Sequence, residues 1–448
     1  MKPYQVLLFI VCCMAVLAVM SSAYVTRMLR DDCDLRWPTL AEVFDYAEPA
    51  ETTEQAEAAE PAEETGESEP AETAEFLAMT DTLAADTMIV EPQPVRVAVP
   101  LVQVDSTTDS RMFLAAFYRS LTEAGERRVR VMHYGDSQIE EDRMSQQIRQ
   151  ALQTRYGGAG AGLVPLAQTI PSRAVHQELH MNGRPITPQQ GPRRYMVYGP
   201  KRTQRTDGLY GPMGQMAVMA DSLVRGSEQL MALIEPLDGG PRYSRMRVFA
   251  DSTIQYTADG DTLWLEGKGN VYGISQESDT GVIVDNIPMR GCLGLVFNKI
   301  DSAQLKRFYA EENVTLLILQ FGGNAIPFNE TPATIGSIVR GLRRQVRFLR
   351  ECAPQASILF IGPSDMLTMV DGMPQTYPMV PYMDRLLRKM ALEENIAYFS
   401  LYQWMGGSGS MAHWQEIGLA GADGIHFTRA GARKAGKAVA KWMMEMDN

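Results

Sequence analysis

A serine, and a histidine with an acidic neighbour, are the residues of this chain that could do chemistry. The tetrapeptide Tyr134-Gly135-Asp136-Ser137 follows a strand-like run at 128–133 and precedes a stretch with helical spacing. A hydroxyl between the carboxyl end of a strand and the amino end of a helix meets free backbone N–H groups and the helix dipole, which favour developing negative charge. Serine and aspartate are also common helix caps, so Ser137 is at this point a candidate nucleophile.

The histidine lies near the far end of the chain, in Asp423-Gly424-Ile425-His426. A carboxylate three residues before an imidazole can hold one ring nitrogen and direct the other at a nucleophile. The chain has five histidines, and His426 is the one with such a neighbour. Ser137, His426 and Asp423 together therefore predict a serine esterase.

Composition argues against several other functions. The five cysteines show neither a disulfide framework nor metal-ligand spacing, and the four other histidines have no ligand-like partners, so we expect no metal and no cofactor. The formal charge of −12 is concentrated in 48–91, which has twelve Glu, two Asp and no Lys or Arg. That stretch carries −14 and the rest of the chain about +2, so no basic domain points to nucleic acid.

The N-terminal segment has the features of an export signal. A lysine at position 2 precedes an apolar run from Val6 to Met20 and the small residues Ser21-Ser22-Ala23. The run is short for a spanning helix of about 17–25 residues, but it reaches that length if the residues through Val25 are included. We favour an uncleaved inner-membrane anchor at 1–25, which would place the protein in the periplasm; the alternative is a cleaved signal peptide and a secreted protein.

The rest of the chain divides by pattern. Residues 26–107 comprise a juxtamembrane segment and a linker rich in Glu, Ala, Thr and Pro, which cannot bury enough apolar area to repay ordering. From 108 on, apolar strand-like runs at 314–321, 357–361 and 396–399 alternate with helical stretches at 333–352, 381–394 and 428–446. This alternation predicts a parallel sheet covered by helices. At 165–282, short alternating runs rich in Gly and Pro predict an all-β insertion.

Four blocks occur in a fixed order: Gly135-Asp136-Ser137, Asn286 to Gly291, Gly322-Gly323-Asn324, and Asp423 to His426. They resemble the four blocks of the SGNH, or GDSL, hydrolase family, and the resemblance covers about 125–160 and 283–445. It implies an α/β protein of three layers, α/β/α, with a parallel sheet whose two parts are 108–164 and 283–448.

The resemblance also implies the roles of the site residues. Ser137 would be the nucleophile, His426 its base and Asp423 the residue that orients His426. The oxyanion hole would consist of the N–H groups of Ser137 and Gly291 and the side-chain amide of Asn324. The glycine donor is open to alternatives, because Gly294 and the turn Gly211-Pro212-Met213-Gly214 are also possible.

An inserted β-domain at 165–282 resembles that of bacterial peptidoglycan O-acetylesterases, where a jelly-roll-like, carbohydrate-binding-like module stands at this point. This implies an exported esterase that removes O-acetyl groups from an envelope polysaccharide such as peptidoglycan. Two alternatives remain. One is an O-acetyltransferase of the same fold beside a membrane acyltransferase partner, because no residue decides between water and a sugar hydroxyl as acceptor. The other is a glycan-binding envelope protein without turnover.

Overall fold

The structure, a computed structural model, describes residues 108–219, 230–237, 242–370 and 372–445. The expected anchor or signal at 1–25 and the acidic linker lie outside the described residues. In the part of the chain that is described, no helix is both long enough and apolar enough to cross a membrane. The N-terminal predictions therefore stay predictions.

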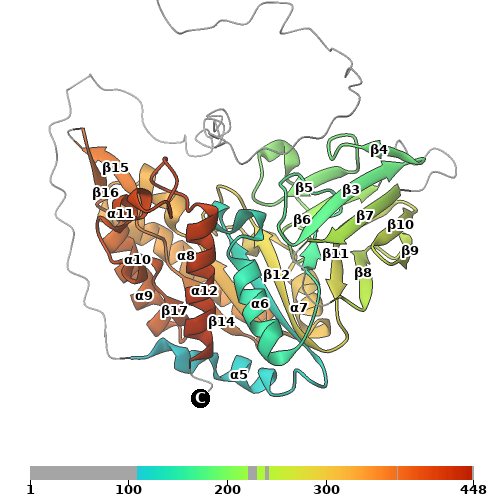
Figure 1. Cartoon of the computed structure of the whole chain (residues 1–448), viewed down its shortest axis with the longest axis horizontal. Helices are drawn as coiled ribbons and strands as arrows, with labels where there is room; N and C mark the ends of the chain where they lie inside the picture. The colour runs from blue at the N-terminus through green and yellow to red at the C-terminus, as the bar shows by residue number, and fades with distance from the viewer. Residues whose placement is uncertain (1–107, 220–229, 238–241, 371, 446–448) are drawn as a thin grey trace, which may run out of the picture. The chain divides into compact units, whose positions relative to one another are not determined.

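A five-stranded parallel sheet forms the centre of the α/β part (Figure 1). Its order is β12-β1-β13-β14-β17, and each neighbouring pair is parallel. The strands are β1 (Arg128–Gly135), β12 (Gly281–Pro288), β13 (Val314–Gln320), β14 (Ser357–Ile361) and β17 (Ala397–Phe399). The last three coincide, to within one residue, with the apolar runs that predicted strands.

Helices cover both faces of this sheet. Helices α7 (Ser302–Glu311), α8 (Pro332–Cys352) and α9 (Val380–Glu393) share one buried core with the sheet, whereas α5 (Ala115–Leu121), α6 (Ser145–Tyr156) and α12 (Arg429–Met444) share another. Side chains alternate along each strand. In β13, Leu317 and Leu319 belong to the first core, and Leu316 and Ile318 belong to the second. The predicted α/β/α arrangement of three layers is confirmed.

The inserted segment forms two antiparallel sheets. One has the order β4-β3-β7-β10-β9, and the other joins β2, β11, β6 and β5, with β8 also paired to β11. The strands are β2 (Gly162–Val164), β3 (Val175–Met181), β4 (Arg184–Ile186), β5 (Arg193–Met196), β6 (Gln215–Met219), β7 (Leu230–Pro236), β8 (Arg245–Ala250), β9 (Gln255–Asp259), β10 (Thr262–Glu266) and β11 (Gly269–Glu277). Leu179 and Ala232 of one sheet share a buried core with Ala217 and Ile274 of the other. The predicted all-β insertion is therefore present, but its strands begin at Gly162, before the predicted start at 165, and Gly281 and Val282 already belong to β12 of the parallel sheet.

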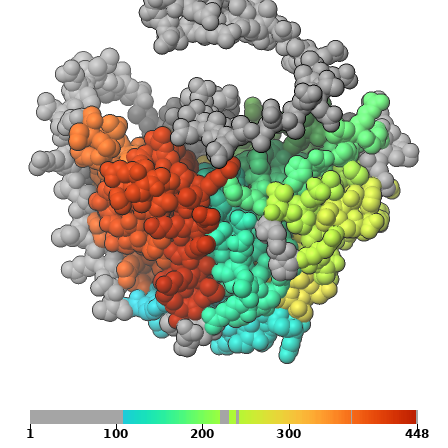
Figure 2. Space-filling view, in the orientation of Figure 1, coloured from blue at the N-terminus to red at the C-terminus, as the bar shows by residue number. Residues whose placement is uncertain are grey.

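The two ends of the insertion lie together. Gly158, after α6, has a φ of +109° and passes so close to β12 that a Cβ would lie 2.3 Å from the Val282 carbonyl oxygen, which only glycine tolerates. The Leu163 N–H of β2 donates to Asp285 of β12 at 2.8 Å. In the space-filling view, the teal surface that includes α6 lies between the red C-terminal helices and the green-yellow inserted strands (Figure 2).

A buried ionic cluster joins the insertion to the parallel sheet. Arg130 of β1 donates to both carboxylate oxygens of Asp285, at 2.7 and 2.9 Å, and to Glu277 of β11 at 3.1 Å and Glu312 at 3.2 Å. Arg247 of β8 also binds Glu277 and Glu312. Arg130 and the three carboxylates are all buried. Arginines and buried carboxylates from the parallel sheet and from the inserted sheets therefore neutralise one another.

Candidate active site

Three loops at one edge of the parallel sheet carry candidate residues. Ser137, Gly291 and Asn324 follow the carboxyl ends of the adjacent strands β1, β12 and β13 within four residues. The chain runs from β1 to β12 on one side and then to β13 on the other. This edge is therefore a topological switch point, where open α/β sheets bind ligands. A fourth loop, which precedes α12, brings Asp423 and His426 to the same place.

The turn at Ser137 differs from the helix start that the sequence predicts. Asp136 caps it, because Asp136 Oδ1 accepts the Gln138 N–H at 3.0 Å. A short 3₁₀ helix follows, but Glu141 takes a left-handed conformation with a φ of +57°, and α6 begins only at Ser145. The expectation that a long helix, with its dipole, starts at the serine is therefore wrong.

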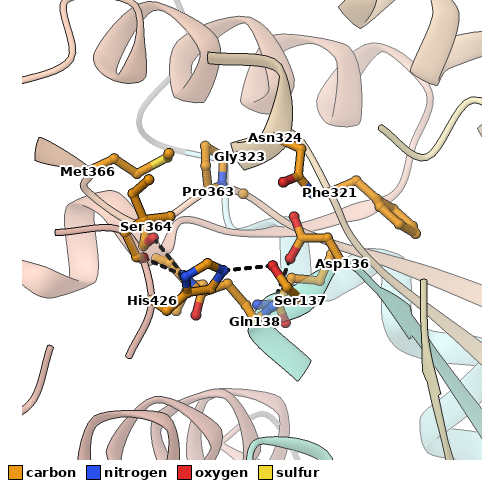
Figure 3. A pocket seen from close by; sticks show the side chains of 14 residues that line it. Asp136, Ser137, Gln138, Phe321, Gly323, Asn324, Pro363, Ser364, Met366 and His426 are labelled. Atoms are coloured by element: carbon orange, nitrogen blue, oxygen red, sulfur yellow. Dashed lines mark hydrogen bonds between the residues drawn. The ribbon is translucent and has the colours of Figure 1, made fainter. Parts of the chain in front are cut away.

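The structure brings Ser137, His426 and Asp423 together. Ser137 Oγ lies 2.8 Å from His426 Nε2, and the two side chains face each other in Figure 3. Asp423 Oδ2 lies 2.7 Å from His426 Nδ1. When Nδ1 carries the proton that binds Asp423, Nε2 is free to accept the proton of the serine hydroxyl. Both separations suit proton transfer and orientation by hydrogen bonds.

Asp423 is held as a carboxylate. Its Oδ1 accepts the backbone N–H groups of Ile425 at 2.9 Å and His426 at 3.0 Å. Burial raises the pKa of Asp423, but the hydrogen bonds from the His426 side chain and from these N–H groups outweigh it and lower the pKa to about 2. The carboxylate therefore stays ionised through the whole range in which an imidazole titrates.

The two other candidate donors differ in placement. Asn324 lines the same cavity as Ser137 and His426 (Figure 3), and its side-chain nitrogen donates to the Cys292 carbonyl at 3.3 Å. Gly291 does not line this cavity. Its φ is +70°, and none of the hydrogen bonds among the described residues uses its N–H. The structure thus places Asn324 in the cavity that Ser137 lines. Gly291 lies outside this cavity, but it precedes Cys292, whose carbonyl Asn324 binds.

The alternative glycines serve packing. A Cβ on Gly294 would lie 2.7 Å from the ring of Phe321, and one on Gly211 would lie 2.7 Å from the Tyr272 side chain. At Gly291, by contrast, no atom of the described residues, apart from its two chain neighbours, lies within 4 Å of the position that a Cβ would take. Gly291 therefore faces open space, whereas Gly294 and Gly211 face other side chains.

The cavity at the serine is small. Its volume is about 20 Å³, where a single water needs about 10–15 Å³. Its lining comes from the loops after β1, β13, β14 and β17 and from the histidine loop. The lining residues are Asp136, Ser137, Gln138, Gln320, Phe321, Gly323, Asn324, Gly362, Pro363, Ser364, Met366, Leu401, Ile425 and His426. Such a space suits a group of few atoms.

Several buried titratable groups lie around the serine, and one of them, Asp136, lines the cavity. Burial raises the pKa of Asp136 to about 6, although the Gln138 N–H acts against it. Burial also raises the pKa of the Cys292 thiol to about 12, which makes it a poor nucleophile. His133, under the site, has a pKa lowered to about 4 by burial and is neutral. No group of three or more His, Cys, Asp or Glu side chains that could hold a metal occurs in the described ranges.

Sequence reasoning missed two residues of the serine turn. Gln138 Nε2 donates to the Ile425 carbonyl at 2.7 Å, and Arg143 donates to the Phe427 carbonyl at 3.2 Å. Both contacts flank His426. The position of Gln138 beside the nucleophile is a signal that could have marked it, whereas nothing in the sequence around Arg143 distinguishes it from a solvated arginine.

Comparison with known proteins agrees with this geometry. Residues 259–434 match the model of the family described as "GDSL-like Lipase/Acylhydrolase family". The match includes Asn324, Asp423 and His426, but it begins within the inserted segment and leaves out Ser137. The assignment of Ser137 to this site therefore rests on its position beside His426. No curated protein matches the chain.

Several solved structures are similar. One titled "Peptidoglycan O-acetylesterase in action, 5 min" has a TM-score of 0.61 at 21% identity, over 76% of this chain and 98% of that chain, which shows a shared fold. A Bacillus subtilis protein matches with a TM-score of 0.30 at 16% identity, over 60% and 90% of the two chains. An acetylxylan esterase mutant from Geobacillus stearothermophilus matches with a TM-score of 0.24 at 18% identity, over 36% and 73%.

Proposed function

We propose that this chain is a serine esterase of the GDSL-like lipase/acylhydrolase family, whose model matches residues 259–434, and that it removes O-acetyl groups from an envelope polysaccharide such as peptidoglycan. One observation carries the proposal: Ser137 Oγ lies 2.8 Å from His426 Nε2, and Asp423 binds the other ring nitrogen at 2.7 Å. This is the arrangement that acyl transfer by a serine needs.

The reaction follows from these contacts. Ser137 Oγ attacks the acetyl carbonyl carbon while His426 Nε2 takes the hydroxyl proton. The bond from the carbonyl carbon to the sugar oxygen then breaks, His426 gives its proton to that oxygen, and acetyl-Ser137 remains. A water molecule attacks the acetyl group and passes a proton to His426. Acetate leaves as Ser137 regains its proton. Asp423 keeps the imidazole oriented and stabilises its charged form throughout.

The oxyanion of each tetrahedral intermediate needs donors at about 2.7–3.1 Å. We assign this role to the N–H groups of Ser137 and Gly291 and to the side-chain amide of Asn324. Their position on three adjacent strand ends supports the assignment. One N–H of the Asn324 amide binds Cys292, and the amide carries a second N–H for the substrate oxygen.

The size of the cavity supports an acetyl group. Pro363, Met366 and Leu401 are among the apolar residues that line it, and the volume is about 20 Å³. An acetyl methyl fits such a space, whereas a longer acyl chain would extend beyond it. Esters of longer acids should therefore react more slowly.

Two observations support a polysaccharide substrate: the similarity to a solved structure and the expected location in the periplasm. The solved structure with the same fold is titled a peptidoglycan O-acetylesterase. The apolar segment at 1–25 and the acidic linker would hold the enzyme at the inner membrane with its site in the periplasm, within reach of an envelope glycan. The inserted sheets would add a surface for the polymer.

The decisive experiment compares substrates on the purified full chain. Wild-type protein and Ser137→Ala are incubated with 4-nitrophenyl acetate, 4-nitrophenyl butyrate and O-acetylated peptidoglycan, and released acetate is measured. We expect Ser137-dependent acetate release, with butyrate slower than acetate. Absence of any Ser137-dependent hydrolysis would refute the esterase. Transfer of the acetyl group to an added sugar in preference to water would instead identify an acetyltransferase, which needs a membrane partner as acyl donor.

A further inference from the structure

The residue after the serine holds the backbone on both sides of the histidine. Gln138 Nε2 donates to the Ile425 carbonyl at 2.7 Å, and Gln138 Oε1 accepts the Phe427 N–H at 3.3 Å. The Gln138 amide thus donates to the peptide group before His426 and accepts from the one after it, as the backbone of a neighbouring β-strand would. Gln138 is itself 8% exposed, so water competes little for these bonds.

Arg143 makes a second link between the same two loops. Its Nη1 donates to the Phe427 carbonyl at 3.2 Å, and its Nη2 donates to the Ser137 carbonyl at 3.0 Å. Its Nε donates to the Glu140 carbonyl at 3.1 Å. One planar guanidinium therefore binds the serine residue, the broken 3₁₀ turn after it and the histidine loop. A lysine could not make these three bonds in fixed directions.

We propose that Gln138 and Arg143 are positioning residues that set the distance between Ser137 Oγ and His426 Nε2. Three hydrogen bonds join the serine turn to the backbone of 425–427, and these two side chains make all three. The inference rests on the proposed esterase function, because the distance matters only if His426 takes the proton of Ser137.

The two loops need such a link for a physical reason. Ser137 follows a strand of the central sheet, but His426 lies in a loop before α12, outside the strand ladder. The backbone at Glu141 is in the left-handed region, so the turn after Ser137 is not stiffened by a continuous helix. A shift of about 1 Å between reacting groups can cost about 10²-fold in rate. Side-chain bonds across the loops would limit that shift.

The test compares Gln138→Ala and Arg143→Met with the wild-type full chain, using 4-nitrophenyl acetate. We expect kcat to fall about 10–10²-fold in each variant while KM changes less than about threefold, because neither side chain forms the oxyanion hole. The rate at which a fluorophosphonate labels Ser137 should fall by a similar factor, since it depends on the same alignment of serine and histidine.

Gln153→Ala is the matched control. Gln153 is buried on α6, and its side-chain nitrogen donates to the carbonyls of Gly160 at 3.3 Å and Val282 at 3.1 Å, away from the serine. We expect it to lower the melting temperature without changing kcat. The low-field proton resonance of the His426 Nδ1–H, which binds Asp423, should shift in the Gln138 and Arg143 variants and stay in place in Gln153→Ala.

The outcomes separate the two claims. If Ser137→Ala abolishes hydrolysis but Gln138→Ala and Arg143→Met retain wild-type kcat and an unmoved resonance, the positioning role is refuted and the esterase stands. If the wild type shows no Ser137-dependent hydrolysis, the esterase fails, and the resonance still reports whether the two side chains hold His426. Should Gln138→Ala not fold, Gln138→Asn keeps the amide on a side chain too short to reach both peptide groups, and the same loss of kcat is expected.

Discussion

The side chain of Asn324 donates to the main-chain carbonyl of Cys292 at 3.3 Å, so the loop after β13 holds the loop after β12. These two strands flank β1, which carries Ser137. The contact therefore couples both proposed oxyanion donors outside the serine turn: the Asn324 amide itself, and the N–H of Gly291, the residue before Cys292. A change at Asn324 acts on one donor directly and on the other through this bond.

Asn324→Ala should lower kcat about 10²–10³-fold, as loss of an oxyanion donor does elsewhere. KM for a small acetyl ester should change little, because the bond to the substrate oxygen forms in the transition state. Steady-state kinetics with 4-nitrophenyl acetate measures both. Asn329→Ala is the control, since the Asn329 amide caps the same short helix by donating to the Ala325 carbonyl at 2.6 Å. An Asn324 variant that behaves like the Asn329 variant would remove Asn324 from the oxyanion hole.

Ser137→Ala should abolish turnover and leave the fold intact. The serine hydroxyl binds His426 at a partly buried position, so its removal opens no large cavity. We expect a melting temperature within about 2 °C of the wild type, together with loss of fluorophosphonate labelling. Ser252→Ala, at an exposed turn in the inserted sheets, should keep full activity. Residual labelling in Ser137→Ala would mean that another residue is the nucleophile.

The sequence predicted the parallel sheet well because its signals are local. Buried strands such as 357–361 are continuous apolar runs, and β14 covers the same five residues. The long amphipathic helices follow a period that the sequence shows directly, so α8 begins at Pro332, one residue before its predicted start. The Asp423–His426 pair could also be found, because both residues lie in one short loop.

Contacts between distant segments could not be predicted in this way. The apolar residues after Ser137 have helical spacing, which gives no sign of the left-handed Glu141 or of the bonds from Arg143 to the carbonyls of Ser137 and Glu140. The inserted segment is not self-contained either. Tyr210 and Met213 lie in the main hydrophobic core with Leu305 of α7, and Tyr134 of β1 donates to the Pro212 carbonyl at 2.7 Å. Deleting the insertion would therefore expose the core of the catalytic part.

Arg130→Met should destabilise the whole fold. Arg130 is fully buried and binds Asp285, Glu277 and Glu312, so its loss leaves buried carboxylates with too little positive charge. Breaking a buried ion pair on one side typically costs about 3–5 kcal/mol. Unfolding in guanidinium chloride should show this loss. Arg245→Met, which removes a half-exposed partner of Glu277, should cost less than about 1 kcal/mol. Equal losses in both variants would contradict a central role for Arg130.

Asp136→Asn should stabilise the protein at alkaline pH. Burial raises the pKa of Asp136 to about 6, from an ordinary value of 3.8, so the folded state binds this proton more tightly than the unfolded state does. Ionising Asp136 therefore removes stability as pH rises from about 4 to about 6, and the cost above that range is on the order of 2–3 kcal/mol. Asparagine cannot ionise, yet it can still accept the Gln138 N–H that Asp136 caps.

Chemical unfolding at two pH values would measure this effect. At pH 8 we expect Asp136→Asn to exceed the wild type in free energy of unfolding by about 2 kcal/mol, and at pH 4 the two should be nearly equal. Asp207→Asn provides a control of opposite sign, because the hydrogen bond from Arg205 lowers the pKa of Asp207, and its loss should slightly weaken the fold at pH 8. If the difference in free energy of unfolding between Asp136→Asn and the wild type is the same at both pH values, burial does not raise the pKa of Asp136.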